Sequence, residues 1–304
     1  MSKVIIHIGP PKTATTSLQI ALEQSNHPYL YYGGTFQPRS RNVASLSANV
    51  FQFCTGSAGS REDFGRIRTE IENAICAGKH VFISEEMLSL EQRTASASFK
   101  LRKLGELLKG FECRILITAR PAKDALPSLY QEIFESLPSN LQLSFPSFCR
   151  DKRSLCYDYS SLCEALIENG FKDIVILEFD KALKEGINLS DLFEDSAIGE
   201  HRVILQRSNI GQTGRSGDLR TLPSVSLKNF GGASLIQSII NRFGMRFWPG
   251  YRRSVTLLER ISLSSSGEKR LQVPQDVVER FDRSYQKSTQ QYGMESSYSE
   301  GGGK

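Results

Sequence analysis

The sequence predicts an α/β fold of three layers, in which a central, mainly parallel sheet is flanked by helices on both faces. Two observations support this prediction. Short apolar runs alternate with amphipathic segments over about the first 180 residues, and this alternation is typical of strands and helices joined in β–α units. In addition, 304 residues suffice for one large domain with a substantial core.

Apolar runs mark the predicted strands, at residues 4–8, 80–84, 113–118 and 173–179. Each run is short and rich in Val, Ile, Leu or Phe, as expected for a strand that is buried on both faces. Between the runs, apolar residues recur at three- and four-residue spacing and predict helices. The first helix begins near Leu18, and the others cover about 62–77, 96–109, 123–136, 160–169 and 273–291.

Other segments show no sustained period. Residues 27–61 are expected to form a surface excursion, either a plain loop or part of an acceptor site. Residues 137–159 predict a polar connection, and residues 198–232 predict a flexible loop rich in Gly, Ser and Arg. No internal repeat or domain boundary is visible, so we expect a single domain over 1–295 and a disordered tail over 296–304.

The composition argues against several classes of protein. The net charge of +5 is too small to indicate nucleic-acid binding, and basic residues do not interleave with aromatic ones. The six cysteines form no CxxC motif, which favours free thiols in a reducing compartment. No apolar run reaches the ~20 residues that span a bilayer, and residues 1–3 lead directly into a strand. We therefore expect a cytoplasmic enzyme.

The junction between the first strand and the first helix, Gly9–Ser17, is suited to hold an anion. Such a junction offers free backbone N–H groups and the positive end of the helix dipole. Lys12 adds a full positive charge, and hydroxyl groups follow it at Thr13, Thr15, Thr16 and Ser17. A helix N-terminus that is merely rich in capping residues would use the same residue types. The Gly-Lys-Ser/Thr ending of a P-loop is absent, because the lysine here precedes the hydroxyl run.

Charged residues also follow the second and the third predicted strand. Glu85 and Glu86 come after the second, and Arg120 comes after the third. Open parallel sheets bind ligands outside the carboxyl ends of their strands, so these side chains are expected at the same edge as Lys12. The planar guanidinium of arginine grips phosphate oxygens in pairs, and Ser128 lies in the helix that follows Arg120.

The loop around Lys12, Pro11-Lys12-Thr13-Ala14-Thr15-Thr16, resembles the 5′-phosphosulfate loop of sulfotransferases that use 3′-phosphoadenosine 5′-phosphosulfate. That family has a glycine where Ala14 stands, a change that needs only room for a methyl group if the local φ is negative. The resemblance implies a P-loop-like fold. It also implies a nucleotide co-substrate whose 5′-phosphosulfate contacts Lys12, Thr13, Ala14, Thr15, Thr16 and Ser17.

The same resemblance implies a second anion site. In this family, an arginine and a serine at the spacing of Arg120 and Ser128 hold the 3′-phosphate of the nucleotide. A basic, glycine-containing loop late in the chain closes over the adenosine. Here Arg215 is the candidate for that part, with Arg207 as the second choice, and a solvated loop without this role is the alternative.

The segment Ser84-Glu85-Glu86-Met87-Leu88 resembles the Ser-x-Glu-x-Leu sequence of bacterial carbohydrate sulfotransferases. This resemblance implies a glutamate as the catalytic base, with Glu86 preferred and Glu85 as the alternative. A surface acidic pair that caps the following segment would look the same. Lys12 is expected to stabilise the leaving phosphate, and no metal is expected, because lysine, arginine and a helix N-terminus supply the positive potential.

These features predict a sulfotransferase that moves a sulfuryl group from 3′-phosphoadenosine 5′-phosphosulfate to a hydroxyl group of a carbohydrate or glycolipid, releasing adenosine 3′,5′-bisphosphate. A lipid acceptor would bring peripheral contact with a membrane. A nucleotide-dependent kinase is the first alternative, although the missing Gly-Lys-Ser/Thr and Mg²⁺ ligand disfavour it. A non-catalytic nucleotide-binding protein of the same fold is the second. The identity of the acceptor and the oligomeric state are not predicted.

Overall fold

A computed structural model describes residues 2–35, 45–56, 61–92, 94–205 and 271–294. Arg207, Arg215 and most of the predicted 198–232 loop lie outside these ranges, as does the predicted 296–304 tail. The chain forms two compact units, one made of 1–125, 152–214 and 278–304, and the other of 126–151 and 215–277. The expectation of one domain over 1–295 stays a prediction.

The larger unit is built on a parallel sheet. Within the described residues the sheet has five strands, in the order β2-β3-β1-β4-β5, and each neighbouring pair is parallel. The strands are β1 (Val4–His7), β2 (Leu30–Tyr32), β3 (His80–Ser84), β4 (Cys113–Ala119) and β5 (Asp173–Glu178). Because β3 lies on one side of β1 and β4 on the other, the strand order reverses at β1. The carboxyl end of β1 is therefore the position where such sheets bind ligands.

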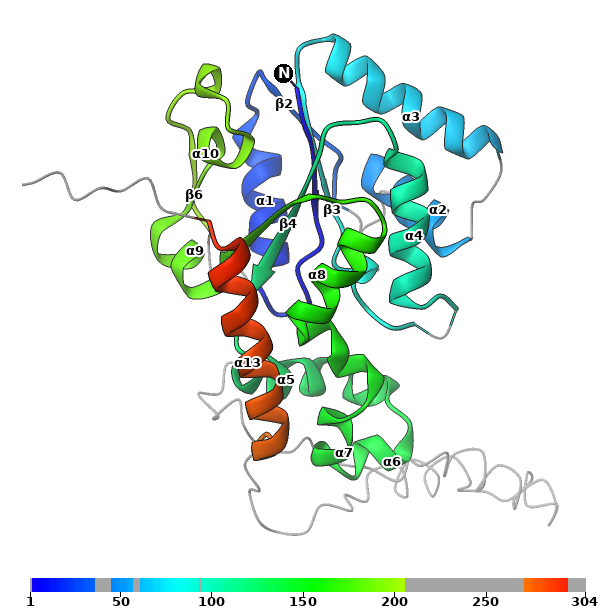
Figure 1. Ribbon diagram of the computed structural model, residues 1–304, viewed down its shortest axis with the longest axis vertical. Coiled ribbons are helices and arrows are strands. Elements are labelled where there is room, and N and C mark those ends of the chain that lie inside the picture. Colours follow the sequence, from blue (N-terminus) through cyan, green and yellow to red (C-terminus); the bar gives the residue numbers. More distant parts are fainter. Residues whose placement is uncertain (1, 36–44, 57–60, 93, 206–270, 295–304) are drawn as a thin grey trace, which may run out of the picture. The chain divides into compact units, whose positions relative to one another are not determined.

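One face of the sheet is covered by α1 (Thr15–Ser25), α9 (Phe179–Glu185) and α10 (Leu189–Phe193), as Figure 1 shows. A short antiparallel pair, β6 (Ile187–Asn188) and β7 (Arg202–Val203), joins this layer. The core of this face combines side chains from the central strands with side chains from the helices, among them Ile5, Phe82, Leu116, Leu18, Leu22, Leu192 and Phe193.

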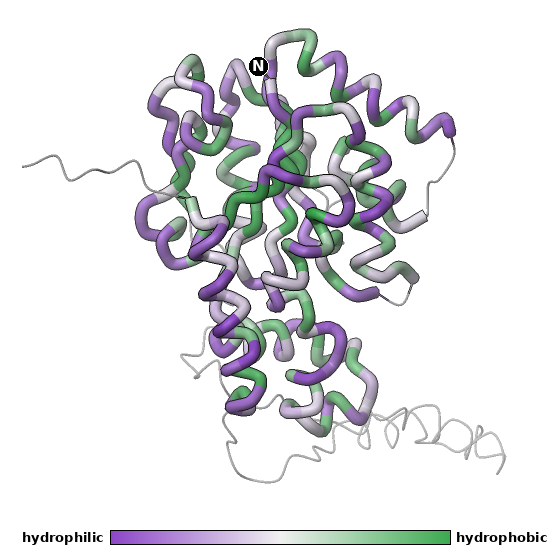
Figure 2. The backbone as a smooth tube through the Cα atoms, in the orientation of Figure 1, coloured by the Kyte–Doolittle hydropathy of each residue, from purple (hydrophilic) through white to green (hydrophobic). Residues whose placement is uncertain are grey.

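The opposite face is covered by α2 (Leu46–Thr55), α3 (Arg61–Cys76), α4 (Ala97–Leu108) and α8 (Tyr159–Glu168) (Figure 1). In Figure 2 the strands form the hydrophobic centre between these two helical layers. The predicted α/β fold, with helices on both faces of a parallel sheet, is confirmed. The C-terminal helix α13 (Gln275–Tyr292) contacts α8, since the Ser160 amide donates to Ser284 Oγ at 2.8 Å.

Arg114 ties β4 to the elements beside it. Its side chain is 6% exposed and donates to Asp173 at the start of β5, to Leu192 O at 2.7 Å and to Glu194 after α10. This buried arginine satisfies several acceptors at once, which makes it a structural centre of the larger unit.

The smaller unit contains most of α5 (Ala122–Ile133), the short helices α6 (Ser139–Gln142) and α7 (Phe145–Cys149), and the 3₁₀ turn η2 (Phe134–Ser136). Tyr130 of α5 packs against aromatic rings of η2 and α7, and its hydroxyl donates to Gln142 O at 2.6 Å. The predicted polar connection at 137–159 thus holds short helices, including η3 (Lys152–Tyr157). Elements of four to six residues are too short to show a helical period.

The alternative of a plain loop over 27–61 is wrong, because the described part of this segment contains β2 and α2, and the alternative of an acceptor site stays a prediction. Helix α2 is capped by Ser45, whose hydroxyl accepts from the Ala48 amide, and it ends at Gly56 with φ 77°. Strand β2 has only three residues and depends on pairing with β3, so no local pattern marks it. The strand predicted at 173–179 ends one residue earlier, because Phe179 begins α9.

Candidate functional site

Polar residues end three adjacent apolar strands of the sheet. His7 ends β1 and Ser84 ends β3, while Thr118 is the last residue but one of β4. His7 Nδ1 lies 2.8 Å from Ser84 Oγ, and His7 Nε2 lies 3.1 Å from Thr118 Oγ1. Burial lowers the pKa of His7 to about 3, so its imidazole is neutral and one ring nitrogen donates while the other accepts.

This buried network continues into the Lys12 loop. Thr118 Oγ1 lies 2.8 Å from Thr13 Oγ1, and Thr13 Oγ1 donates to Pro10 O at 2.5 Å. Since the Thr13 proton is used there, Thr118 donates to Thr13, and His7 Nε2–H in turn donates to Thr118. Gly9 leaves the room for this contact, because a Cβ atom at that position would lie 2.0 Å from Thr118 Oγ1.

The network bears on the predicted role of Thr13. Its side chain is fully buried, and its hydroxyl bonds to Pro10 O within the loop and to Thr118 of β4. The hydroxyl of Thr13 is therefore a structural group, and a part for Thr13 in binding an anion stays a prediction.

The Lys12 loop contains left-handed backbone at two residues that are not glycine, with φ 65° at Lys12 and φ 66° at Ala14. The condition of a negative φ at Ala14 is thus not met, and the side chain there costs about 1 kcal/mol relative to glycine. Loops that pass through left-handed residues turn consecutive N–H groups toward one centre, which is a binding arrangement for anions.

The N-terminus of α1 lacks a side-chain cap. Ala14 occupies the N-cap position and makes no side-chain hydrogen bond to the first turn. In that turn the hydroxyl of Thr15, a residue only 2% exposed, has no hydrogen-bond partner among the described residues. A buried hydroxyl without a partner costs about 1–3 kcal/mol, so an acceptor oxygen from a ligand would satisfy it. Thr16 and Ser17 follow in the same turn.

Arg120 lies beside this loop. Its guanidinium Nη1 donates to Lys12 O at 3.3 Å, and its Cζ lies 4.6 Å from the ring centroid of Phe179. Stacking on an aromatic ring orients the planar guanidinium and leaves its edge for other acceptors. Ser128 is on α5 in the smaller unit, and its pairing with Arg120 stays a prediction, as does the role of Arg215.

The adjacent carboxylates Glu85 and Glu86 differ in their surroundings. Glu85 is 1% exposed, its Oε1 accepts from the Met87 amide at 3.0 Å, and its Oε2 has no hydrogen-bond partner among the described residues. Burial raises the pKa of Glu85 to about 8, so this carboxyl is protonated at neutral pH. It influences the pKa of Lys100 in α4 and of Cys54 in α2, which places it on the side of the α2–α4 layer.

Glu86 is half-buried and opens the 3₁₀ turn η1 (Glu86–Leu88). Burial raises the pKa of the Tyr157 hydroxyl well above its usual value, and the Glu86 carboxylate adds to that rise. Tyr157 in turn donates to Pro11 O at 2.8 Å. Glu86 is thus the more exposed of the two carboxylates, and its charge acts on the pKa of Tyr157, a residue that bonds to the Lys12 loop.

Lys100 holds the segment that follows the two glutamates. Its side chain is fully buried, and Nζ donates to Met87 O, to Leu90 O at 2.6 Å and to Gln92 Oε1 at 3.1 Å. All three ammonium protons therefore have acceptors. Burial lowers the pKa of Lys100 to about 8.

Sequence reasoning missed these supporting residues, although signals for some of them exist. His7, Ser84 and Thr118 are polar residues at the ends of apolar strands. Lys100 lies four residues before Leu104 and eight before Leu108, and therefore on the apolar stripe of its helix.

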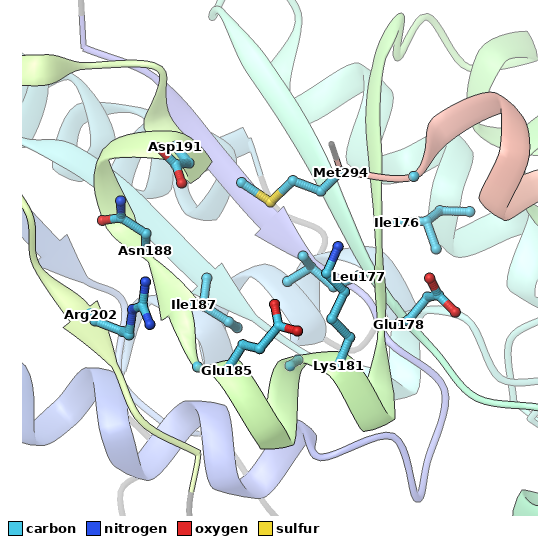
Figure 3. Close-up of a pocket in the computed structure, with 13 residues that line it drawn as sticks. Ile176, Leu177, Glu178, Lys181, Glu185, Ile187, Asn188, Asp191, Arg202 and Met294 are labelled. Atoms are coloured by element: carbon cyan, nitrogen blue, oxygen red, sulfur yellow. The ribbon is translucent and has the colours of Figure 1, made fainter. Parts of the chain in front are cut away.

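A separate pocket lies at the β5 edge of the sheet (Figure 3). It lies between β5, α9, β6 and the Gly293–Met294 segment, has a cavity volume of about 90 Å³ and is partly open to solvent. Lys181 and Glu185 of α9 line this pocket, as does Arg202 of β7. None of the residues in the predicted site lines this pocket.

Comparisons with known proteins give little beyond this geometry. No family model and no curated protein matches the chain. Among solved structures it is similar to a sulfotransferase from Alicyclobacillus acidocaldarius, with 14% sequence identity, a TM-score of 0.41, and an alignment covering 72% of this chain and 89% of that one. At this identity and TM-score the similarity assigns neither fold nor activity. No described helix is both long and apolar enough to cross a membrane.

Proposed function

We propose that this protein is a sulfotransferase that moves a sulfuryl group from 3′-phosphoadenosine 5′-phosphosulfate to an acceptor hydroxyl. The observation that carries the proposal is the buried hydroxyl of Thr15 in the first turn of α1, which has no hydrogen-bond partner in the described part of the chain. It lies at the carboxyl end of β1, where the strand order reverses. A phosphate at this position would accept from Thr15 and from the backbone N–H groups, and the helix dipole would favour its charge.

The contacts of Arg120 support a second phosphate site close to the first. Its guanidinium is held against Phe179 and against Lys12 O, and within the described residues its other N–H groups have no acceptor. A nucleotide with phosphates at both its 5′ and 3′ positions would use both sites. Ser128 and Arg215 remain the further residues predicted to bind the 3′-phosphate.

The donor supplies a sulfur atom that an acceptor oxygen attacks while the bond from sulfur to the 5′-phosphate oxygen breaks. The residues of this chain would provide charge and a base for that exchange. Lys12 and the first-turn N–H groups would stabilise the negative charge that develops on the phosphate oxygen. Glu86 would take the proton of the acceptor hydroxyl, because it is partly exposed, whereas Glu85 is 1% exposed and protonated at neutral pH.

The acceptor class follows from the resemblance of Ser84–Leu88 to bacterial carbohydrate sulfotransferases. We propose a hydroxyl group of a carbohydrate or glycolipid, modified in the cytoplasm, with peripheral membrane contact if the acceptor is a lipid.

Isothermal titration tests the proposal. We expect the wild-type protein to bind adenosine 3′,5′-bisphosphate and not to bind ATP with Mg²⁺. Lys12→Ala should weaken bisphosphate binding roughly tenfold or more, because it removes a charged contact. Lys172→Ala, which removes an exposed lysine just before the amino end of β5, is the matched control and should bind as the wild type does. Binding of ATP with Mg²⁺ and not of the bisphosphate would refute the proposal in favour of a kinase.

A further inference from the structure

The short stretch Tyr157-Asp158-Tyr159, which joins η3 to α8, contacts both loops of the proposed nucleotide site. Tyr157 is fully buried, and its hydroxyl donates to Pro11 O at 2.8 Å in the Lys12 loop. Tyr159 is 1% exposed, and its hydroxyl accepts from the Arg120 amide at 2.9 Å and donates to Arg120 O at 3.0 Å. Two buried hydroxyl groups from one stretch thus hold the backbones of two loops that are more than 100 residues apart in the sequence.

The two loops also touch each other, through the Arg120 guanidinium and Lys12 O at 3.3 Å. Each loop is thus bonded to one tyrosine of the stretch, and the two loops are bonded to each other. Phenol rings are rigid, with two side-chain torsions each, so a buried tyrosine that is bonded at its tip fixes the distance from its own backbone to its partner.

The stretch is itself held by hydrogen bonds to α13. Asp158 accepts from Ser284 Oγ at 2.8 Å and from Arg280 Nη2 at 2.9 Å, and it caps α8 by accepting from the Ser161 amide. The Ser160 amide donates to Ser284 Oγ. The position of the tyrosines therefore depends on the C-terminal helix as well as on α8.

We infer that Tyr157 and Tyr159 are positioning residues that set the spacing between the 5′-phosphate loop and the 3′-phosphate arginine, and that α13 holds them in place. This inference rests on the proposed function for the identity of the ligand. It goes beyond that function by assigning the distance between the two phosphate sites to residues that touch neither phosphate.

The inference is tested with Tyr157→Phe and Tyr159→Phe, each of which removes one hydroxyl and keeps the ring. Titration with adenosine 3′,5′-bisphosphate, adenosine 5′-monophosphate and adenosine 3′-monophosphate separates the contributions of the two phosphates. Tyr159→Phe should reduce the gain in affinity from the 3′-phosphate roughly three- to tenfold. Tyr157→Phe should reduce the gain from the 5′-phosphate by a similar factor.

Two further variants complete the series. Tyr31→Phe is the matched control, since Tyr31 Oη donates to Glu70 between β2 and α3, away from both loops. It should leave all three affinities unchanged. Ser284→Ala removes bonds to Asp158 and to the Ser160 amide without touching either loop. It should reduce the affinity gained from each phosphate by a smaller factor than the corresponding tyrosine variant does.

Hydrogen exchange on the ligand-free variants gives a second readout that does not require a nucleotide. Tyr157→Phe should speed amide exchange in residues 9–17, and Tyr159→Phe should speed it in residues 118–123. If the wild type fails to bind the bisphosphate, the proposed function fails, and faster exchange in these two segments still supports the bracing role. Folded variants with wild-type exchange in both segments would overturn the inference, as would wild-type affinities in a protein that binds the bisphosphate.

Discussion

Replacing Glu85 with glutamine should stabilise the protein relative to the wild type by an amount that grows as the pH rises from about 5 to 8. The carboxyl of Glu85 is 1% exposed, and burial raises its pKa from 4.5 to about 8. The folded protein thus binds this proton more tightly than the unfolded chain does. The stabilisation is fully present below about pH 4.5 and is lost as the pH rises through 8. Glutamine keeps the acceptor for the Met87 amide and has no proton to lose.

The magnitude follows from the window between the two pKa values. Within it, the wild type should lose about 1.4 kcal/mol of stability per pH unit relative to the variant. Between pH 5 and pH 7.5 the difference should change by about 3 kcal/mol. Burial lowers the pKa of the neighbouring Lys100 to about 8, and this effect has the opposite sign and falls above pH 8, outside the window. Cys54 and Tyr32, which also face Glu85, titrate above the window too.

Urea unfolding at several pH values between 5 and 7.5 measures this difference directly. Glu168→Gln, which removes an exposed carboxylate from α8, is the control and should follow the wild type. Equal pH dependence of Glu85→Gln and the wild type would refute the assignment of a neutral, buried Glu85. Sulfuryl transfer provides a second contrast, since Glu85→Gln should retain it and Glu86→Gln should abolish it without loss of nucleotide binding.

Three further substitutions test individual contacts by their effect on the free energy of unfolding. Ala14→Gly should stabilise the protein by up to about 1 kcal/mol, because it relieves a left-handed φ of 66°. Lys100→Met should destabilise it by about 1–3 kcal/mol, because it leaves two carbonyls and an amide oxygen without their buried donor, and it should reduce transfer more than nucleotide binding. Arg114→Met should cost about 3 kcal/mol, at the low end for a broken buried ion pair, since the partner carboxylates of Asp173 and Glu194 are partly exposed.

Matched variants separate these effects from general damage to the fold. Ala21→Gly in the middle of α1 should destabilise by about 1 kcal/mol, the opposite sign to Ala14→Gly. Lys103→Met, on the same helix as Lys100 but 30% exposed in its side chain, should have little effect. Destabilisation by Ala14→Gly, or equal losses for the two lysine variants, would contradict the contacts described above.

The strands β1, β3, β4 and β5 were predictable because each is a short apolar run. For the same reason the positions of Lys12, Glu85, Glu86 and Arg120 were predictable, since each follows such a strand at one edge of a parallel sheet. Strand β2 and the short helices at 139–157 were missed because they are too short for a pattern of apolar residues to repeat clearly.

The conformation and support of the loop could not be predicted from local sequence. The positive φ of Ala14 depends on how the loop is held, and the hydroxyl of Thr13 is turned inward by a contact with Thr118. Tyr157 reaches Pro11 across 146 positions of the sequence. Such contacts arise only when distant segments come together, and no spacing rule within the sequence indicates them.

The central claim is that the buried hydroxyl of Thr15, which no other described residue bonds, belongs to a 5′-phosphate site. The most direct test is titration of Thr15→Val, which keeps the shape of the side chain and removes the hydroxyl, with adenosine 3′,5′-bisphosphate and with adenosine 3′-monophosphate. We predict that the variant binds the bisphosphate roughly tenfold or more weakly than the wild type and binds the 3′-monophosphate with unchanged affinity, while Thr15→Ser binds both ligands as the wild type does. A Thr15→Val variant that binds the bisphosphate with wild-type affinity would contradict the claim.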